Sequence, residues 1–405
     1  MRAIWEVFIV CLRLGCTSFG GPIAHLGYFR TEFVVRRRWV TDAAYAECVA
    51  LCQVLPGPTS SQVGFAIGRY RAGVAGGVAA WVGFTLPSAL LLGALALGVM
   101  TSDGDLSDPS LERAREGAIR GVLAVAVAVI ALAVRGMAVA LAPDLARALI
   151  AILCGTLVLV WGSPGASLGA VVIGAIAGLI WLRGSTDATE AVPGSPLAAT
   201  PRHAAGAAIA LVVLLGTLPL LAVLTRDPTV QLLDAITRAG ATVFGGGHVV
   251  LAMLHSEPAV GQSIAQDHLL LGYGAAQAVP GPMFTLATYL GMMFEPDAAW
   301  GARIALAAAA TFAIFLPGML LVTAVSPVWS RMLRSPRARG ALGGINAAVV
   351  GVLAAAWFDP VLVHGVDGLQ TVIWVGASLA ALHARVPPWG VVLGGALGGA
   401  LGWLG

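Results

Sequence analysis

The sequence predicts an all-α polytopic membrane protein made of two homologous halves, and three observations carry this prediction. Hydrophobic residues make up 58% of the 405-residue chain and charged residues only 11%, whereas a soluble domain carries about 25% charged residues. Charge-free runs such as residues 73–100 exceed the roughly 20 apolar residues that cross a bilayer as one helix. Finally, several motifs of the first half return in the same order in the second.

The duplicated motifs define the two halves. The stretch "RLGCTSFGG", which begins at Arg13, returns as "RAGATVFGG" from Arg238, an offset of 225 residues with six of nine positions identical. "QVLPGP" returns as "QAVPGP", a Leu-Pro pair returns, and "GAIRGV" returns weakly as "GALGGI". We therefore predict one repeat over residues 1–183 and another over residues 227–405. Residues 184–226 are expected to form a polar linker and one unpaired transmembrane helix.

The charged loops predict that the two halves lie in the membrane with opposite orientation. Residues 30–38 carry four arginines and one acid, whereas the equivalent residues 255–267 carry two acids and no arginine. Residues 103–116 are mainly acidic, and the equivalent residues 331–339 carry four arginines and no acid. Because cytoplasmic loops accumulate arginine, we expect an inverted-topology repeat. The N-terminus should then lie in the cytoplasm and the C-terminus outside.

Each half should begin with two broken hairpins that enter the membrane and return on the same side. In the first half these are residues 1–28, which turn at Phe-Gly-Gly, and residues 41–69, which turn at Pro-Gly-Pro. The unpaired crossing then inverts the second half, which repeats the pattern. Nine full crossings are expected, at residues 73–100, 117–141, 147–162, 166–182, 204–224, 303–325, 340–358, 368–384 and 387–404.

The glycine- and proline-rich motifs predict four breaks in helices at membrane depth. Non-helical backbone is tolerated there only where it is buried in protein or lines a water-filled cavity. Each break begins a new helix, whose free N–H groups and positive dipole end favour an anion. Inverted repeats with such helices are typical of secondary transporters. The alternative is that glycine only permits close helix packing and proline only kinks the chain. The glycines expected to contact the anion are Gly20, Gly21, Gly57, Gly245, Gly246 and Gly281.

Polar side chains near the breaks supply the other candidate ligands. Arg13 and Arg238 lie about one and a half turns before the Phe-Gly-Gly breaks, and an arginine at that depth is a functional candidate. The alternative is a structural ion pair, of Arg13 with Glu6 and of Arg238 with Asp234. The neutral candidates could instead satisfy backbone groups freed by the breaks. They are Thr17, Gln53, Thr59, Ser60, Thr242, Gln277 and Thr285.

Three ionisable side chains are candidates for proton coupling. Histidine changes charge near neutral pH, which favours His25 and His248, and Glu47 lies inside the second broken hairpin. The alternative for each histidine is an ordinary hydrogen-bonded role in a packed site.

Nothing in the sequence predicts an enzyme, a cofactor or a metal site. The chain lacks a phosphate-binding G-x-x-x-x-G-K loop, a His-Glu metal motif and a nucleophile elbow. Cys48 and Cys52 are expected to be core side chains. The partners implied are an oxyanion and membrane lipid but no nucleic acid, and the interpretation leaves a homodimer open.

The motifs together resemble the chromate ion transporter family in its long, two-domain form. The resemblance rests on "FGGPIAHLGYFRTEFV", "WVTDAAYAECVALCQVLPGPTSSQVGFAIG" and "GFTLPSALLL", and on "FGGGHVVLAML", "GYGAAQAVPGPMFTLATYLG" and "FLPGMLLV" in the second half. It implies export of chromate across the bacterial inner membrane, driven by the proton motive force and conferring chromate resistance. Sulfate is the natural look-alike. A passive oxyanion channel and a sulfate transporter of the same architecture are the alternatives. One tryptophan common in the family before the second hairpin is missing from "LHSEPAVGQSIAQDHLL".

Overall fold

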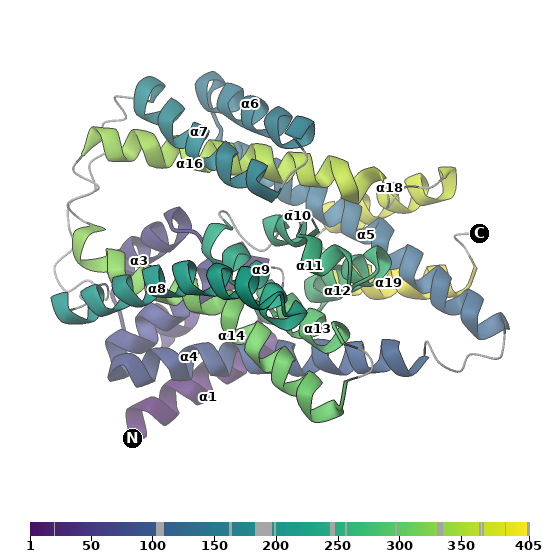
Figure 1. Cartoon of the computed structure of the whole chain (residues 1–405), viewed down its shortest axis with the longest axis horizontal. Coiled ribbons are helices and arrows are strands. Elements are labelled where there is room, and N and C mark those ends of the chain that lie inside the picture. The colour runs from purple at the N-terminus through teal and green to yellow at the C-terminus, as the bar shows by residue number, and fades with distance from the viewer. Residues whose placement is uncertain are drawn as a thin grey trace.

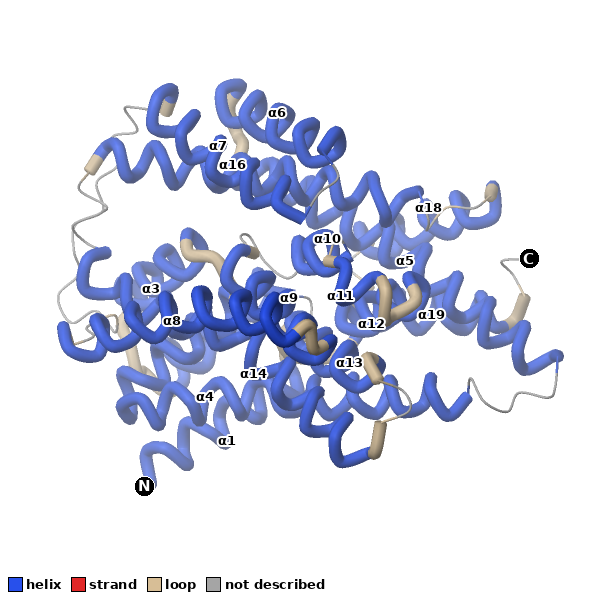
Figure 2. Tube along the Cα trace, viewed as in Figure 1, coloured by secondary structure: helices blue, strands red, loops and turns tan. Residues whose placement is uncertain are grey.

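The fold is entirely helical in the part of the chain that the computed structural model describes, as the sequence predicts (Figures 1 and 2). The described residues are 1–19, 21–102, 109–161, 164–182, 197, 200–243, 248–255, 257–295, 298–329, 335–363, 366, 368–384 and 386–402.

The helices of the first half are α1 (Arg2–Thr17), α2 (Gly21–Phe29), the π-helix η1 (Arg30–Arg36), α3 (Asp42–Val54), α4 (Thr59–Ser102), α5 (Pro109–Leu141), α6 (Leu145–Trp161) and α7 (Pro164–Trp181). The helix α8 (Pro201–Thr225) follows the linker. The helices of the second half are α9 (Pro228–Thr242), α10 (His248–His255), α11 (Pro258–Gly261), α12 (Gln266–Ala278), the short 3-10 helix η2 (Met283–Thr285), α13 (Leu286–Met293), α14 (Trp300–Val325), η3 (Ser326–Val328), α16 (Pro336–Ala356), the π-helix η4 (Trp357–Leu362), α18 (Leu369–His383) and α19 (Pro388–Ala400).

The helices break where the glycine and proline motifs predict. Ser18 ends α1 and Val243 ends α9, and both residues have extended backbone angles. Leu55 and Val279 end α3 and α12 in the same conformation, just before each Pro-Gly-Pro. The same local geometry therefore occurs twice, at positions 225 or 224 residues apart. We call two positions related by these offsets matched positions.

Helix α4 is two helices joined by a tight turn, so residues 59–71 and residues 74–102 form a hairpin. Ala72 leaves the helical region, and Gly73 has a φ of +68°. The two arms then lie backbone to backbone, since a Cβ on Gly68 would lie 2.5 Å from the carbonyl oxygen of Gly76. This turn confirms the boundary expected between the second broken hairpin and the crossing at residues 73–100.

Five segments are long and apolar enough to cross a bilayer in the described part of the chain, fewer than the nine crossings expected. They are residues 59–100, 116–139, 201–225, 300–328 and 336–356. The helices at the other four expected crossings, α6, α7, α18 and α19, are only 13 to 18 residues long. Apolar side chains of α8 project outward, among them Val212, which is 71% exposed. Exposed apolar surface of this kind suits contact with lipid.

Helices of one half pack against helices of the other half along rows of glycine, which we call glycine seams. In the second half, α16 packs against α6 and α7 of the first half, whereas α5 of the first half packs against α18 and α19 of the second (Figure 1). Gly117 and Gly121 of α5 contact the backbone of Gly399 and Gly395 in α19. In the same way, Gly340 and Gly344 of α16 contact Gly178 and Gly174 of α7. Small residues spaced four apart let membrane helices approach this closely. The weak echo of "GAIRGV" in "GALGGI" therefore marks two equivalent helix seams.

Two reciprocal backbone hydrogen bonds tie the breaks of one half to the breaks of the other. The N–H of Gly57 donates to the carbonyl of Val243 at 2.6 Å, and the N–H of Gly281 donates to the carbonyl of Ser18 at 2.9 Å. Gly57 and Gly281 are matched positions, and so are Ser18 and Val243. We call this pair of bonds the crossed junction.

Both junction glycines occupy backbone conformations and spaces that other residues do not fit. Gly57 has a φ of +116° and Gly281 a φ of +102°, a region that residues with a Cβ rarely adopt. A Cβ on Gly281 would lie 2.9 Å from the Ser88 hydroxyl oxygen, and a Cβ on Gly57 would lie 3.1 Å from the Cα of Gly318. Backbone geometry and packing thus both require glycine here.

We expect Gly57→Ala and Gly281→Ala each to lower the free energy of unfolding by about 1–3 kcal/mol, because alanine is strained at positive φ. Thermal unfolding of the purified protein in detergent measures the change. Gly216→Ala on α8 is the control, since nothing lies within 4 Å of its Cβ position. Gly73→Ala separates strain from collision, because Gly73 also has positive φ but open space around it. Junction variants that melt no lower than Gly216→Ala would show that the crossed junction does not hold the halves together.

Candidate functional site

The Ser18–Gly281 side of the crossed junction is surrounded by polar side chains of the first half. The imidazole of His25, on α2, lies beside the backbone of Ser18, with its Nδ1 3.4 Å from the hydroxyl oxygen of Ser60. The ring is buried and meets the Phe84 ring edge to face, with a centroid separation of 5.3 Å. The helix starts at Gly21 and Thr59 therefore meet at this junction through His25 and Ser60.

The Val243–Gly57 side of the junction is held by one glutamine. Gln62 is fully buried, and its Nε2 donates to the carbonyl of Pro56 at 2.8 Å and to that of Gly318 at 3.2 Å. Gly318 follows the second Leu-Pro pair, as Ser88 follows the first. Gln62 thus links a first-half break to a second-half helix.

Several buried polar atoms on the segments that meet at the junction have no hydrogen-bond partner among the described residues. They are Ser18 Oγ, His25 Nε2, Ser61 Oγ, Gln62 Oε1 and Thr85 Oγ1. Leaving such a group unpaired costs about 1–3 kcal/mol, so each needs an explanation. Three of the five are hydroxyls that can donate a hydrogen bond. Neutral donors beside helix N-termini are suited to an oxyanion, which accepts hydrogen bonds with all of its oxygens.

The structure brings the candidate ligands Gly57, Gly281, Thr59 and Ser60, and the proton-coupling candidate His25, to the junction or its immediate surroundings. The candidates Thr59, Ser60 and Thr285 are buried in the first turn after each Pro-Gly-Pro. The Thr285 hydroxyl donates to the carbonyl of Pro282 at 2.7 Å, so it satisfies local backbone. Gly21 has a φ of +76° and its Cβ position lies 3.9 Å from the sulfur of Met283, which follows the second Pro-Gly-Pro.

The other four neutral candidates are not shown to contact the crossed junction: two bond the backbone of their own helix, one is exposed and one bonds a tyrosine. The hydroxyl of Thr17 donates to the carbonyl of Arg13 at 2.8 Å, and that of Thr242 donates to the carbonyl of Arg238 at 2.6 Å. This is the backbone-satisfying alternative that the sequence left open. Gln53 is exposed, whereas its matched residue Gln277 is buried and hydrogen-bonded to Tyr273.

The proton-coupling candidates are only partly described. Glu47 is buried on α3, and its Oε2 has no hydrogen-bond partner among the described residues. His248 is the first residue of α10, and its side chain lies outside the described part. Gly20, Gly245 and Gly246 also lie outside it.

The two arginines of the repeated stretch have different partners. Arg238 donates from Nε to Asp234 at 2.9 Å, and from both terminal nitrogens to Glu257 at 2.7 Å and 2.9 Å. The ion pair with Asp234 is the alternative that the sequence left open. The side chain of Arg13 has no ion-pair or hydrogen-bond partner among the described residues, because Glu6 and Glu32 are bound by other arginines.

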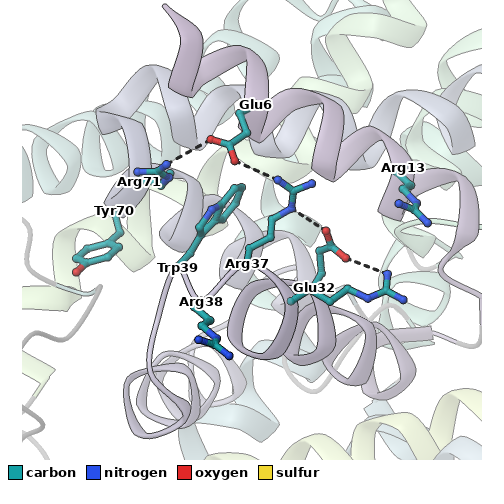
Figure 3. Close-up of a pocket in the computed structure, with 9 residues that line it drawn as sticks. Glu6, Arg13, Glu32, Arg37, Arg38, Trp39, Tyr70 and Arg71 are labelled. Atoms are coloured by element: carbon teal, nitrogen blue, oxygen red, sulfur yellow. Dashed lines mark hydrogen bonds and ion pairs between the residues drawn. The ribbon is translucent and has the colours of Figure 1, made fainter.

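Arg13 lines a cavity of about 1020 Å³, which we call the basic pocket (Figure 3). Its lining residues are Glu6, Arg13, Glu32, Arg36, Arg37, Arg38, Trp39, Tyr70 and Arg71. These residues come from α1, the 30–39 segment and the turn of α4, three segments expected on one side of the membrane.

Glu32 is the best-satisfied acid of the basic pocket. It accepts from Arg37 at 2.7 Å and from Arg36 at 3.3 Å. Burial opposes ionisation of Glu32, but the hydrogen bonds from Arg37 and Arg36 outweigh it and hold the pKa of the carboxyl below its usual value. Glu32 therefore stays a carboxylate near neutral pH and neutralises part of the arginine charge.

A second cavity, of about 550 Å³, lies at the matched place in the second half, and we call it the neutral pocket. Its lining residues are Pro219, Ala222, Val223, Arg226, Gln231, Asp234, Arg238, Glu257, Pro258 and Ala259. Gln231, Arg238 and Glu257 are the matched positions of Glu6, Arg13 and Glu32. The two pockets are therefore built from corresponding residues, but two arginines balance two acids in the second.

Sequence reasoning named Arg13, Glu6 and Arg238 but did not single out Gln62, Ser18 or Thr85, or the pocket that forms around Arg13. Gln62 could have been found as the last of four consecutive polar residues after the first Pro-Gly-Pro. The basic pocket could not, because its residues are distant in the sequence and become neighbours only when α4 turns at Gly73.

Comparison with known proteins agrees with this architecture. A family model described as "Chromate transporter" matches residues 5–182 and again residues 230–402. The chromate transport protein of Pseudomonas aeruginosa is 27% identical over 419 residues, which covers 98% of this chain and 92% of that protein. A probable chromate transport protein of Synechococcus elongatus is 26% identical and covers 93% and 88%, and the chromate transport protein of Cupriavidus metallidurans is 26% identical and covers 87% and 81%.

No solved structure matches the chain at a significant level. The family model nevertheless accounts for both halves, and the match covers 81–92% of the three chromate transport proteins named above. Together with the apolar helices, these matches indicate a membrane-embedded protein. The chain belongs to the chromate transporter family.

Proposed function

We propose that this protein exports chromate across the bacterial inner membrane by alternating access around the crossed junction. The observation that carries the proposal is a set of buried polar atoms on the segments that meet there, which have no hydrogen-bond partner among the described residues: Ser18 Oγ, His25 Nε2, Ser61 Oγ and Thr85 Oγ1. A tetrahedral dianion would accept hydrogen bonds from such groups, and the helix starts at Gly21 and Thr59 add backbone N–H groups. The division into residues 1–183, 184–226 and 227–405 belongs to the same proposal.

Chromate is the substrate that the family membership favours, and sulfate is a look-alike of the same shape and charge. Hydroxyl donors and helix N-termini serve both anions, so the transported species is assigned from the relatives rather than from the site. Export is the direction that requires less coupling. Expelling a dianion from a negative-inside cell is electrically downhill by about 4.6 kcal/mol at 100 mV, from about 2.3 kcal/mol per charge.

Alternating access is supported by the different states of two matched arginines. Arg238 is locked to Glu257 by two hydrogen bonds beside the neutral pocket. At the matched positions Arg13 and Glu32 are not bonded to each other, and the larger pocket lies beside them. We infer that the opposite state closes Arg13 onto Glu32 and releases Arg238 from Glu257. A passive channel would instead need both pockets connected at once.

Proton coupling is assigned to His25 and Glu47, with His248 as a third candidate. Glu47 is a buried carboxyl on α3, and its Oε2 has no hydrogen-bond partner among the described residues. His25 touches the junction through Ser60, so its protonation would change the charge seen by the anion.

The orientation of the halves follows from their arginines. Arg36, Arg37, Arg38 and Arg71 converge on the basic pocket, and cytoplasmic loops are rich in arginine. We therefore place the basic pocket and the N-terminus in the cytoplasm. The neutral pocket then faces outward, and the C-terminus lies outside.

Chromate flux into proteoliposomes tests the function. With the membrane potential clamped at zero, we expect an imposed pH gradient to concentrate chromate beyond the level reached without it. Glu47→Gln should retain chromate exchange but lose the gradient-driven accumulation, whereas the exposed control Glu295→Gln should behave as the unmodified protein. Flux that never exceeds equilibrium would favour a channel, and absence of chromate flux in every gradient would reject chromate as substrate.

Cysteine labelling tests the inverted orientation. Arg38 and the matched residue Ser263 are both exposed, so each can carry a single cysteine in a cysteine-free background. An impermeant maleimide added to intact cells should label Ser263→Cys, and should label Arg38→Cys only after the cells are opened. Labelling of both positions from the same side would contradict the inverted-repeat assignment.

A further inference from the structure

We propose that the basic pocket is an equilibrium binding site for a dianionic oxyanion group, separate from the crossed junction. The inference rests on the proposed function only for the identity of the natural ligand, because binding can be measured without transport. The site would take a free tetrahedral oxyanion or the phosphomonoester headgroup of a lipid, which present the same chemistry.

The charge of the basic pocket is not balanced by its own acids. Five arginines and two glutamates line it, a net charge of +3. Glu32 is bound by Arg36 and Arg37, and Glu6 by Arg37 at 3.0 Å and by Arg71 at 3.3 Å. Arg13 and Arg38 have no acidic partner among the described residues. Two guanidinium groups therefore remain to bind an anion.

The pocket holds two of its five arginines, Arg37 and Arg71, against an aromatic ring. The indole of Trp39 lies between two guanidinium groups, with the Cζ of Arg37 5.6 Å and the Cζ of Arg71 5.7 Å from its ring centroid. Figure 3 shows Glu6 bridging Arg37 and Arg71 beside this indole, with Arg13 on the far side of Glu32. A planar guanidinium can bind an oxyanion with two parallel hydrogen bonds. Arg37 and Arg71 are thereby preorganised, and preorganised groups lose little entropy when an anion arrives.

The neutral pocket lacks both the unbalanced arginine charge and the tryptophan of the basic pocket. Arg238 occupies the matched position of Arg13 but gives its Nε, Nη1 and Nη2 to Asp234 and Glu257. Trp39 is replaced at its matched position by Ile264. Corresponding backbone positions thus hold an uncompensated arginine in one half and a neutralised one in the other.

The position of Arg13 connects the basic pocket to the junction. Arg13 precedes Ser18 by five residues on α1, about 7.5 Å along a helix. A cavity of one sign of charge raises the local concentration of its counter-ion. An anion held by Arg13 would therefore be concentrated within two helical turns of the carbonyl that accepts from Gly281.

Binding of radiolabelled sulfate to the full chain in phosphatidylcholine nanodiscs tests the inference. We expect Arg13→Gln to weaken sulfate affinity at least tenfold and Arg38→Gln several-fold. Arg226→Gln should stay within twofold of the unmodified protein. Arg226 is a close control, because Arg38 and Arg226 are both exposed arginines with a φ near +50° and each lines one pocket.

Native mass spectrometry of nanodiscs that contain phosphatidic acid identifies the source of the ligand. Sulfate binding that depends on Arg13 and Arg38 supports a free oxyanion. Retained phosphatidic acid that is lost in Arg13→Gln, without sulfate binding, supports a lipid headgroup. Absence of both, or sulfate affinity unchanged in Arg13→Gln and Arg38→Gln, would overturn the inference. Arg13-dependent binding without chromate flux would support the binding site and reject the transport proposal. Chromate flux without such binding would support transport and reject the binding site.

Discussion

The arrangement of the two halves depends on a pair of backbone hydrogen bonds that only glycine can make in this geometry. Gly57 and Gly281 donate to the carbonyls of Val243 and Ser18, at points where helices have ended and the backbone has no helical partner. Backbone groups at membrane depth need such partners. Each half therefore supplies the hydrogen bonds that the breaks of the other half lack. This explains why the chain contains the same motifs twice, since one copy alone would leave its breaks unsatisfied.

At the glycine seams, whole helices of each half likewise pack against helices of the other half. Helix α16 packs on α6 and α7, and α5 packs on α18 and α19, so neither half keeps its own outer helices. Backbones meet directly at Gly121 and Gly395 and at Gly344 and Gly174. Helices that meet at such seams are held together by close van der Waals packing. Hydrophobic burial contributes little to their association inside a lipid bilayer. The alternating access that we propose would move the helices of each seam together, about the crossed junction.

Much of the fold could be predicted because its signals are local. Apolar runs fix the long helices, and the Phe-Gly-Gly and Pro-Gly-Pro motifs fix the breaks at Ser18, Leu55, Val243 and Val279. Five of the nine expected crossings coincide with full-length apolar helices in the described part of the chain, whereas the helices at the other four are 13 to 18 residues long. The site was predicted only in part. The sequence singles out Gly57 and Gly281 but not their partners, and the alternative that it left open for Arg13, an ion pair with Glu6, is absent because Glu6 is bound by Arg37 and Arg71. Such pairings depend on contacts between distant segments, and matched positions such as Gln53 and Gln277 can differ in burial.

The central claim is that the basic and neutral pockets open in turn around the crossed junction. Distances between paired spin labels, measured by double electron–electron resonance, test it most directly. One pair is placed at Val35 and Tyr70 beside the basic pocket, and the other at Val223 and Ala259 in the neutral pocket. All four positions lie outside the crossed junction and carry no ion pair in the described structure. On addition of chromate, the account predicts a shorter distance in the first pair and a longer distance in the second, in the same population of molecules. Distances that stay fixed, or that lengthen together, would contradict it.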